Sequence, residues 1–296
     1  MKQKKFWLAT LSLATAACMA FGLAGCGEIE NPDTGKEENP PIVTPGGDEQ
    51  GGEQGGQQGG ERVESEGLEF KLNEDGESYS VVGIGSCKDL DIVIPSIYEG
   101  QPVTSIGTGA FYNCSSLTSI TIPDGVTSIG SAAFAGCSNL SSITIPDSVS
   151  ELGSEAFIEC GSLKSIVIPN GVLKIKSATF SGCSSLTSVV IGNGVASIEH
   201  YAFLSCTSLT SIEIPDNVSR IEADTFKDCN SLTSITIGSG MSFIGFETFM
   251  GCNKLTKITF NGTTERWKEI LYSAWDRDTG DYTVYCTDGQ LKKGDF

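Results

Sequence analysis

A 23-residue period runs through most of this 296-residue chain and constrains its fold more than any other feature. One copy, residues 110–132, has the sequence AFYNCSSLTSITIPDGVTSIGSA. Seven cysteines keep the same step from Cys114 to Cys252, and columns of phenylalanine and leucine keep it beside them. A fixed period of roughly 20–50 residues indicates a solenoid, in which each coil buries its apolar face against the next.

Each copy predicts one strand followed by one turn. The segment from Leu117 to Ile122 ends in apolar–polar alternation, which is typical of a half-buried strand. Pro123 ends the strand because proline has no N–H to donate, and Pro-Asp-Gly then favours a turn. Val126 and Ile129 are the next inward residues on the returning side. A single coil cannot bury so many apolar side chains, so the coils must stack into a rod.

The repeat AFxxCxxLxxIxIPxxVxxIG resembles that of the BspA-type leucine-rich repeat family, and the resemblance covers roughly Leu68 to Phe296. We therefore expect a β-rich solenoid, a leucine-rich repeat rod of about eight 23-residue coils with N- and C-terminal caps. The resemblance implies a bacterial surface protein whose role is adhesion or protein binding, in some members to host surface or matrix components. Because a fold does not determine a function, this role is an expectation from analogy.

The N-terminal segment predicts lipid anchoring. Three lysines precede an apolar stretch from Phe6 to Phe21, which is too short for a confident membrane span. Leu-Ala-Gly-Cys26 then resembles a lipobox. We expect residues 1–25 to be a lipoprotein signal peptide and Cys26 to be acylated, which would hold the mature chain at the surface of the bacterial cell envelope. An ordinary signal peptide with a chance cysteine is the alternative.

The remaining chain divides into regions that differ in composition and in how closely they follow the 23-residue repeat. Residues 26–67 are rich in Gly, Glu, Gln and Pro and predict a disordered acidic tether. Residues 68–109 predict an N-terminal cap and an atypical first repeat, whose turn is expanded at 96–103. Residues 110–262 hold the regular repeats, and residues 263–296 predict a C-terminal cap with a short helix and a hairpin. Trp267 and Trp275 are expected to cover the open core, with a ligand platform as the alternative.

The cysteine column predicts packing rather than chemistry. Each cysteine is separated from the next by about one coil, whereas metal sites place cysteines a few residues apart. Parallel side chains hold neighbouring Cβ atoms about 4.8 Å apart, slightly too far for a disulfide. We expect seven buried free thiols, and no metal or cofactor. The state of Cys87 and Cys286 is left open.

The charge and the motifs argue against several other functions. The formal net charge of −18 lacks the basic footprint of a nucleic-acid-binding protein, and we expect a monomer. His200 is the only histidine, and the inward cysteines are poor partners for a catalytic dyad. Neither a serine-nucleophile elbow nor an HExxH motif occurs. A paired-carboxylate glycosidase stays open, but the chain is predicted not to be an enzyme.

The outward strand positions are mostly serine and threonine, which suit a soluble strand face and offer no aromatic anchor for a partner. Departures from this pattern are the candidates for a binding surface: Tyr112, Val167, Val190, Tyr201, Glu213, Phe243, Phe246 and Lys257. The predicted function is non-catalytic recognition of a protein or glycan ligand on host or neighbouring cells. A structural envelope spacer without a ligand is the alternative.

Overall fold

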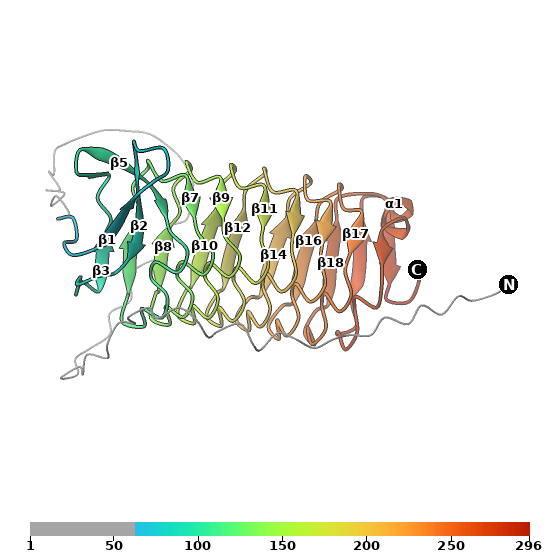
Figure 1. Ribbon diagram of the computed structural model, residues 1–296. Coiled ribbons are helices and arrows are strands. Elements are labelled where there is room, and N and C mark those ends of the chain that lie inside the picture. The colour runs from blue at the N-terminus through green and yellow to red at the C-terminus, as the bar shows by residue number, and fades with distance from the viewer. Residues whose placement is uncertain (1–62) are drawn as a thin grey trace, which may run out of the picture.

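The computed structural model describes residues 63–296, which form an elongated rod with its first coil at one end and the C-terminal residue at the other (Figure 1). The rod is a β-solenoid of about nine turns of roughly 23 residues. Each turn has three sides: a strand of sheet 1, a strand of sheet 2, and a run of tight turns. The predicted solenoid is confirmed. The count exceeds eight because the C-terminal segment adds one more parallel strand, β20.

Sheet 1 takes its longer, mostly parallel strands one from each turn. Ser165 lies beside Ser188 and Ile166 beside Val189, so residues one period apart are neighbours. The inward side chains are buried and the outward ones exposed or half-buried, as the alternation predicts. The strands of sheet 1 are β3 (Asp91–Val93), β6 (Ser119–Thr121), β8 (Ser142–Thr144), β10 (Ser165–Ile168), β12 (Ser188–Ile191), β14 (Ser211–Ile214), β16 (Ser234–Ile237), β18 (Lys257–Phe260) and β20 (Thr283–Cys286).

Sheet 2 lies on the returning side of each coil, where the sequence indicated only inward residues such as Val126 and Ile129. Most of its strands have two residues, and the second points into the core. They are β2 (Tyr79–Gly83), β5 (Gln101–Ile106), β7 (Ser128–Ile129), β9 (Glu151–Leu152), β11 (Lys174–Ile175), β13 (Ser197–Ile198), β15 (Arg220–Ile221), β17 (Phe243–Ile244) and β19 (Leu271–Tyr272).

The third side is built from turns and carries the phenylalanine column. Seven rings from Phe111 to Phe249 stack nearly parallel, with centroids 5.2–5.5 Å apart, and all are buried. Backbone bonds join successive coils here, such as Phe157 N–H to Thr179 O at 2.9 Å. Stacked aromatic rings and paired backbone groups therefore run the length of the regular repeats.

The N-terminal end is closed by added strands. β1 (Glu69–Leu72) pairs antiparallel with β2, which in turn pairs parallel with β5. The expanded turn predicted at 96–103 contains a short antiparallel pairing of β4 (Ile97–Tyr98) with the start of β5. The Phe70 and Tyr98 rings stack at 4.0 Å against this end of the core.

The C-terminal end matches the predicted helix and hairpin. Helix α1 (Thr264–Lys268) has Thr263 as its N-cap, whose hydroxyl accepts from the Arg266 N–H. β20 and β21 (Gly289–Lys292) form the antiparallel hairpin. Trp267 and Trp275 are only 1% and 2% exposed and lie against the end of the core. They cover the core as expected, and their burial excludes a ligand platform.

The backbone ladders are interrupted at three places within residues 63–296. In sheet 1, β8 and β10 are neighbours without a ladder between them, and so are β12 and β14. In sheet 2, the ladder stops between β9 and β11. β8 and β9 share one coil and β10 and β11 the next, so both ladders stop at the same level, although the Lys164 N–H still donates to Ser141 O at 3.4 Å just before β10. There the third side remains bonded, and an ion pair of 2.8 Å joins Lys176 to Glu151.

Candidate binding surface

The outward column at the centre of sheet 1 brings three predicted residues together. Val167 and Val190 are register partners on β10 and β12, and both are more than half exposed. Glu213 occupies the same position on the next strand, β14. The equivalent residues on β6 and β8 are Thr121 and Thr144. The departures from threonine are therefore adjacent, in consecutive coils, and form one surface.

These three side chains line a groove of about 440 Å³ on the surface of the rod. Its other wall is the turn that follows each strand. The side chains of that wall are a column of acids and amides one period apart, followed by one amide from the last regular coil: Asp147, Asn170, Asn193, Asp216 and Asn261. The groove thus has an apolar patch from the strands and a polar wall from the turns.

Hydrogen bonds between coils order the polar wall. Asn170 Oδ1 accepts from the Asn193 N–H at 2.8 Å, and Asp216 Oδ1 accepts from the Ser239 N–H at 2.7 Å. The bond from Ser239 holds the pKa of Asp216 below its ordinary value of 3.8. The lowered pKa favours the ionised carboxylate, so Asp216 contributes negative charge to the groove.

A close backbone approach shapes the floor of the groove. Gly192 occupies the position that Pro123, Pro146 and Pro169 hold in earlier coils. A Cβ at Gly192 would lie 2.6 Å from Pro169 O, which is too close for any side chain. The coil of β12 therefore lies tighter against the coil of β10 than a residue with a side chain would allow.

The other predicted residues do not join this groove. Lys257 is on β18, and its ammonium lies 5.6 Å from the Tyr285 ring centre. Phe243 is on sheet 2, with the Arg220 guanidinium 4.5 Å above its ring. Phe246 lies just after Phe243 in the same coil and is exposed. Lys257 shares sheet 1 with Val167 and Val190 but lies several coils away, whereas Phe243 and Phe246 are on another side of the rod.

Tyr112 and Tyr201 are on the third side, separated by about four coils. Both rings are partly exposed, but the coils between them put roughly 20 Å between the two positions. The eight candidates therefore belong to several separate places, and only Val167, Val190 and Glu213 share one groove.

Sequence reasoning missed the polar wall of the groove. Asp147, Asn170, Asn193 and Asp216 directly follow Pro or Gly, where Asp and Asn are ordinary turn residues. The sequence nevertheless indicated a polar column, because an acid or amide recurs at this position in five successive coils from Asp124 onward. Such a column places like groups side by side along the rod.

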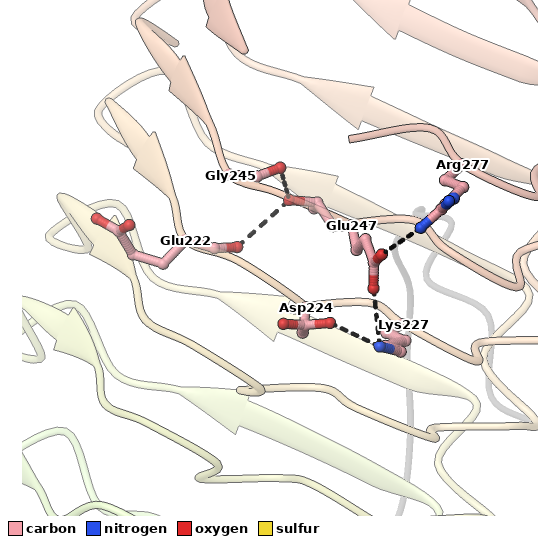
Figure 2. A network of polar contacts seen from close by, with 7 residues as sticks. Glu222, Asp224, Lys227, Gly245, Glu247 and Arg277 are labelled. Carbon is pink, nitrogen blue, oxygen red and sulfur yellow. Dashed lines mark hydrogen bonds and ion pairs between the residues drawn. The ribbon is translucent and has the colours of Figure 1, made fainter. Parts of the chain in front are cut away.

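A second polar cluster links the last coils to the C-terminal cap through ion pairs (Figure 2). The Lys227 ammonium lies 2.9 Å from Asp224 and 3.0 Å from Glu247, and Arg277 lies 3.2 Å from the other oxygen of Glu247. Burial alone would raise the pKa of Glu247, but hydrogen bonds from Lys227 and Arg277 outweigh it and lower that pKa. Each charge has an opposite partner, so the cluster stabilises the cap.

The seven cysteines of the column are buried thiols, as predicted. From Cys137 onward each Sγ donates to the carbonyl of a phenylalanine in the preceding coil, as Cys183 does to Phe157 at 3.2 Å. Burial raises the pKa of Cys183 and Cys252 to about 12. Cys87 is also free and buried, and Cys286 is free and half-buried.

The described residues offer little for catalysis. His200 is exposed, whereas the thiols of the column are buried, so the two do not form a dyad. Between residues 63 and 296, no three His, Cys, Asp or Glu side chains are placed to hold a metal ion. In the same range, no helix has the length and hydrophobicity needed to cross a bilayer.

The fold and its exposed groove define a leucine-rich repeat solenoid, a class that is typically non-catalytic and binds other molecules. The model of the BspA type leucine rich repeat region matches in six copies, over residues 104–230 and 173–274. The chain therefore belongs to the BspA-type leucine-rich repeat family, whose members are bacterial cell-surface proteins. A comparison with curated proteins gave no match.

Solved structures of bacterial leucine-rich repeat proteins share this fold. A leucine-rich cell surface protein of Faecalibacterium prausnitzii A2-165 is 25% identical, with a TM-score of 0.51 and 75% of each chain covered. A leucine-rich repeat protein of Bacteroides ovatus is 24% identical, with a TM-score of 0.51 over 75% of this chain and 70% of the other. The leucine-rich repeat protein of T. pallidum is 29% identical, with a TM-score of 0.48 over 66% of this chain and 83% of the other.

Proposed function

We propose that this chain is a lipid-anchored recognition rod of the bacterial cell surface, without catalytic activity, and that it binds a protein ligand in the groove over β10, β12 and β14. The observation that carries the proposal is the adjacency of Val167, Val190 and Glu213 in one groove. The exposed valine pair stands out on a strand face that is otherwise mostly serine and threonine. Exposed apolar groups with a polar rim are typical of interaction sites.

The surface location rests on the family and on the N-terminal sequence. Cys26 and the residues around it lie outside the described residues, so their sequence pattern is the support for acylation. The described chain begins at the first coil, so the segment from Cys26 would attach the rod by that end (Figure 1). Two or more acyl chains anchor a protein stably to a membrane.

A binding screen tests recognition. The soluble chain, residues 27–296, is immobilised and screened against matrix proteins, mucins and glycans at low and at physiological salt. We expect saturable binding that survives physiological salt, since apolar contact is not screened. For the ligand so found, Val167→Thr with Val190→Thr should weaken binding about tenfold, from the loss of two apolar contacts. Thr121→Ser is the matched control, because Thr121 lies on β6, where the outward residues of sheet 1 are serine and threonine.

Binding that disappears with salt would instead indicate diffuse attraction of basic partners to an acidic protein. If no ligand binds at any salt, the structural spacer becomes the better explanation. Anchoring is tested separately, with the whole chain expressed in a bacterium and labelled with an alkyne analogue of palmitate. We expect label and membrane association in the wild type and neither in Cys26→Ser. Label retained in that variant would contradict acylation at Cys26.

A further inference from the structure

The groove over β10, β12 and β14 carries negative charge that the protein does not neutralise. Three carboxylates line it, those of Asp147, Glu213 and Asp216, and the lining contains neither lysine nor arginine. The ion pairs formed between residues 63 and 296 include none of the three. All three carboxylates are exposed, so they are open to a ligand. A positively charged group on a ligand would form ion pairs with these carboxylates.

The apolar and charged groups lie on opposite walls. Val167 and Val190 project from the strands, whereas Asp147 and Asp216 project from the turns that follow them. An extended polypeptide has the same arrangement, since its successive side chains point to opposite sides. A segment lying along the rod could place apolar side chains on the valines and basic ones against the carboxylates.

The size of the groove agrees with a short extended segment. From the coil of Asp147 to the coil of Asp216 there are three coil spacings of about 4.8 Å, or roughly 14 Å in all. An extended chain covers that distance in about four residues at roughly 3.3 Å each. The Asn170 Nδ2 group is available to a ligand carbonyl, because the bond to Asn193 uses only its Oδ1 atom.

Other ligand classes fit less well. The lining has no aromatic side chain on which a sugar ring could stack. The three carboxylates repel phosphate, which excludes nucleic acid and anionic lipid headgroups. The carboxylates are also too dispersed to hold a metal ion among the described residues. Lysine and arginine bring the positive charge together with apolar stems that can cover Val167 and Val190.

We propose that the ligand of this groove is an extended polypeptide segment of about four to six residues in which lysine or arginine alternates with small apolar residues. This inference rests on the proposed function and specifies its partner. The orientation follows the rod axis, with apolar side chains toward Val167 and Val190. The basic side chains face Asp147 and Asp216, and Glu213 is close to the end of the apolar pair.

The probe is a fluorescein-labelled hexapeptide of alternating lysine and valine, acetylated and amidated, titrated with the soluble chain in 0.15 M salt (about the physiological value). We expect saturable binding by fluorescence anisotropy. The peptide with serine in place of valine should bind about tenfold more weakly, because it loses the apolar contacts. The peptide with glutamate in place of lysine should not bind, because like charges repel.

Glu213→Gln should raise the dissociation constant about threefold to fivefold, the effect of one exposed ion pair. Glu155→Gln is the matched control, because it removes the same charge from the third side of the rod, where Glu155 is exposed. An equal shift in both variants would overturn the inference in favour of diffuse attraction. So would equal binding of the lysine and glutamate peptides.

The experiment separates this inference from the proposed function. If the lysine–valine peptide does not bind but the ligand from the screen still depends on Val167 and Val190, the groove recognises something else and only the present inference fails. If the ligand is indifferent to both valines, the proposed binding groove fails as well. Circular dichroism of each variant confirms that the rod is intact.

Discussion

Two regions of sheet 1 are built on the same repeat and have different surfaces. Over β6 and β8 the outward residues are Thr121 and Thr144, and over β10 and β12 they are Val167 and Val190. The inward residues do not differ, since isoleucine or valine is buried in all four strands. The comparison shows that the core is uniform while the surface varies locally. In a solenoid, changes on the surface can alter binding without altering the stack.

A substitution that disrupts the uniform core should have the largest effect on the free energy of unfolding. Phe180 is fully buried between the Phe157 and Phe203 rings, at 5.5 and 5.4 Å. We expect Phe180→Ala to lower the free energy of unfolding by about 3–5 kcal/mol, from lost burial and the cavity left behind. Urea unfolding followed by circular dichroism measures it. A loss below about 1 kcal/mol would mean that the stack rearranges to fill the space.

A side chain added at Gly192, where the two coils approach closely, should have the next largest effect on stability. We expect Gly192→Ala to destabilise by about 1–3 kcal/mol, since its Cβ meets backbone atoms of Pro169 that cannot move freely. Gly125→Ala is the matched control, because its Cβ would lie 3.5 Å from Val103 O, an ordinary contact. Equal stability of the two variants would show that the coils of β10 and β12 are not held at this spacing.

The polar cluster at the C-terminal cap should contribute less, and in a pH-dependent way. We expect Glu247→Gln to cost about 1–2 kcal/mol at neutral pH, from weakened hydrogen bonds to Lys227 and Arg277. The pKa of Glu247 is lowered by folding, so its contribution is present above its ordinary value of 4.5 and is lost as pH falls through the folded value.

The difference between wild type and Glu247→Gln should therefore shrink in the acid range, below about pH 4. Urea unfolding at pH 7, 4 and 3 follows it, with Glu155→Gln as a control that removes a carboxylate without an ion pair in the described residues. A difference that stays constant over the three pH values would contradict the assigned role of the charge.

The valines of the groove should have the smallest effect on stability. Val167 and Val190 are 57% and 54% exposed, so replacing both by threonine should change the free energy of unfolding by no more than about 0.5 kcal/mol. The same urea experiment measures it. A large loss would show that the pair is needed for the stability of β10 and β12, and would remove the main argument for a binding surface.

The core could be predicted from sequence because its residues repeat. Residues equivalent to Phe180, Cys183 and Leu186 recur every 23 residues, and stacking of the coils puts equivalent residues in contact. The cap was predictable from local signals, such as Thr263 before the helix. Sheet 2 was not, because strands of two residues are too short to show alternation.

The groove could be predicted only in part. Val167, Val190 and Glu213 departed from the repeat and so could be noticed. Asp147 and Asn193 belong to a recurring column of acids and amides, but Asp and Asn are also ordinary turn residues, so the column did not indicate that it faces the strands across a groove. The missing ladders beside β10 and β12 have no counterpart in the repeat pattern of the sequence. Sequence could therefore identify the unusual residues but not the wall that faces them.

Hydrogen–deuterium exchange of the soluble chain, with and without the ligand found in the screen, tests the central claim most directly. The account predicts slower exchange on binding in three segments, 165–170, 188–193 and 211–216, which contain both walls of the groove. Residues 119–124, the equivalent segment over β6, should exchange at an unchanged rate. Protection confined to the third side around Tyr112 or Tyr201, or spread evenly along the rod, would contradict it.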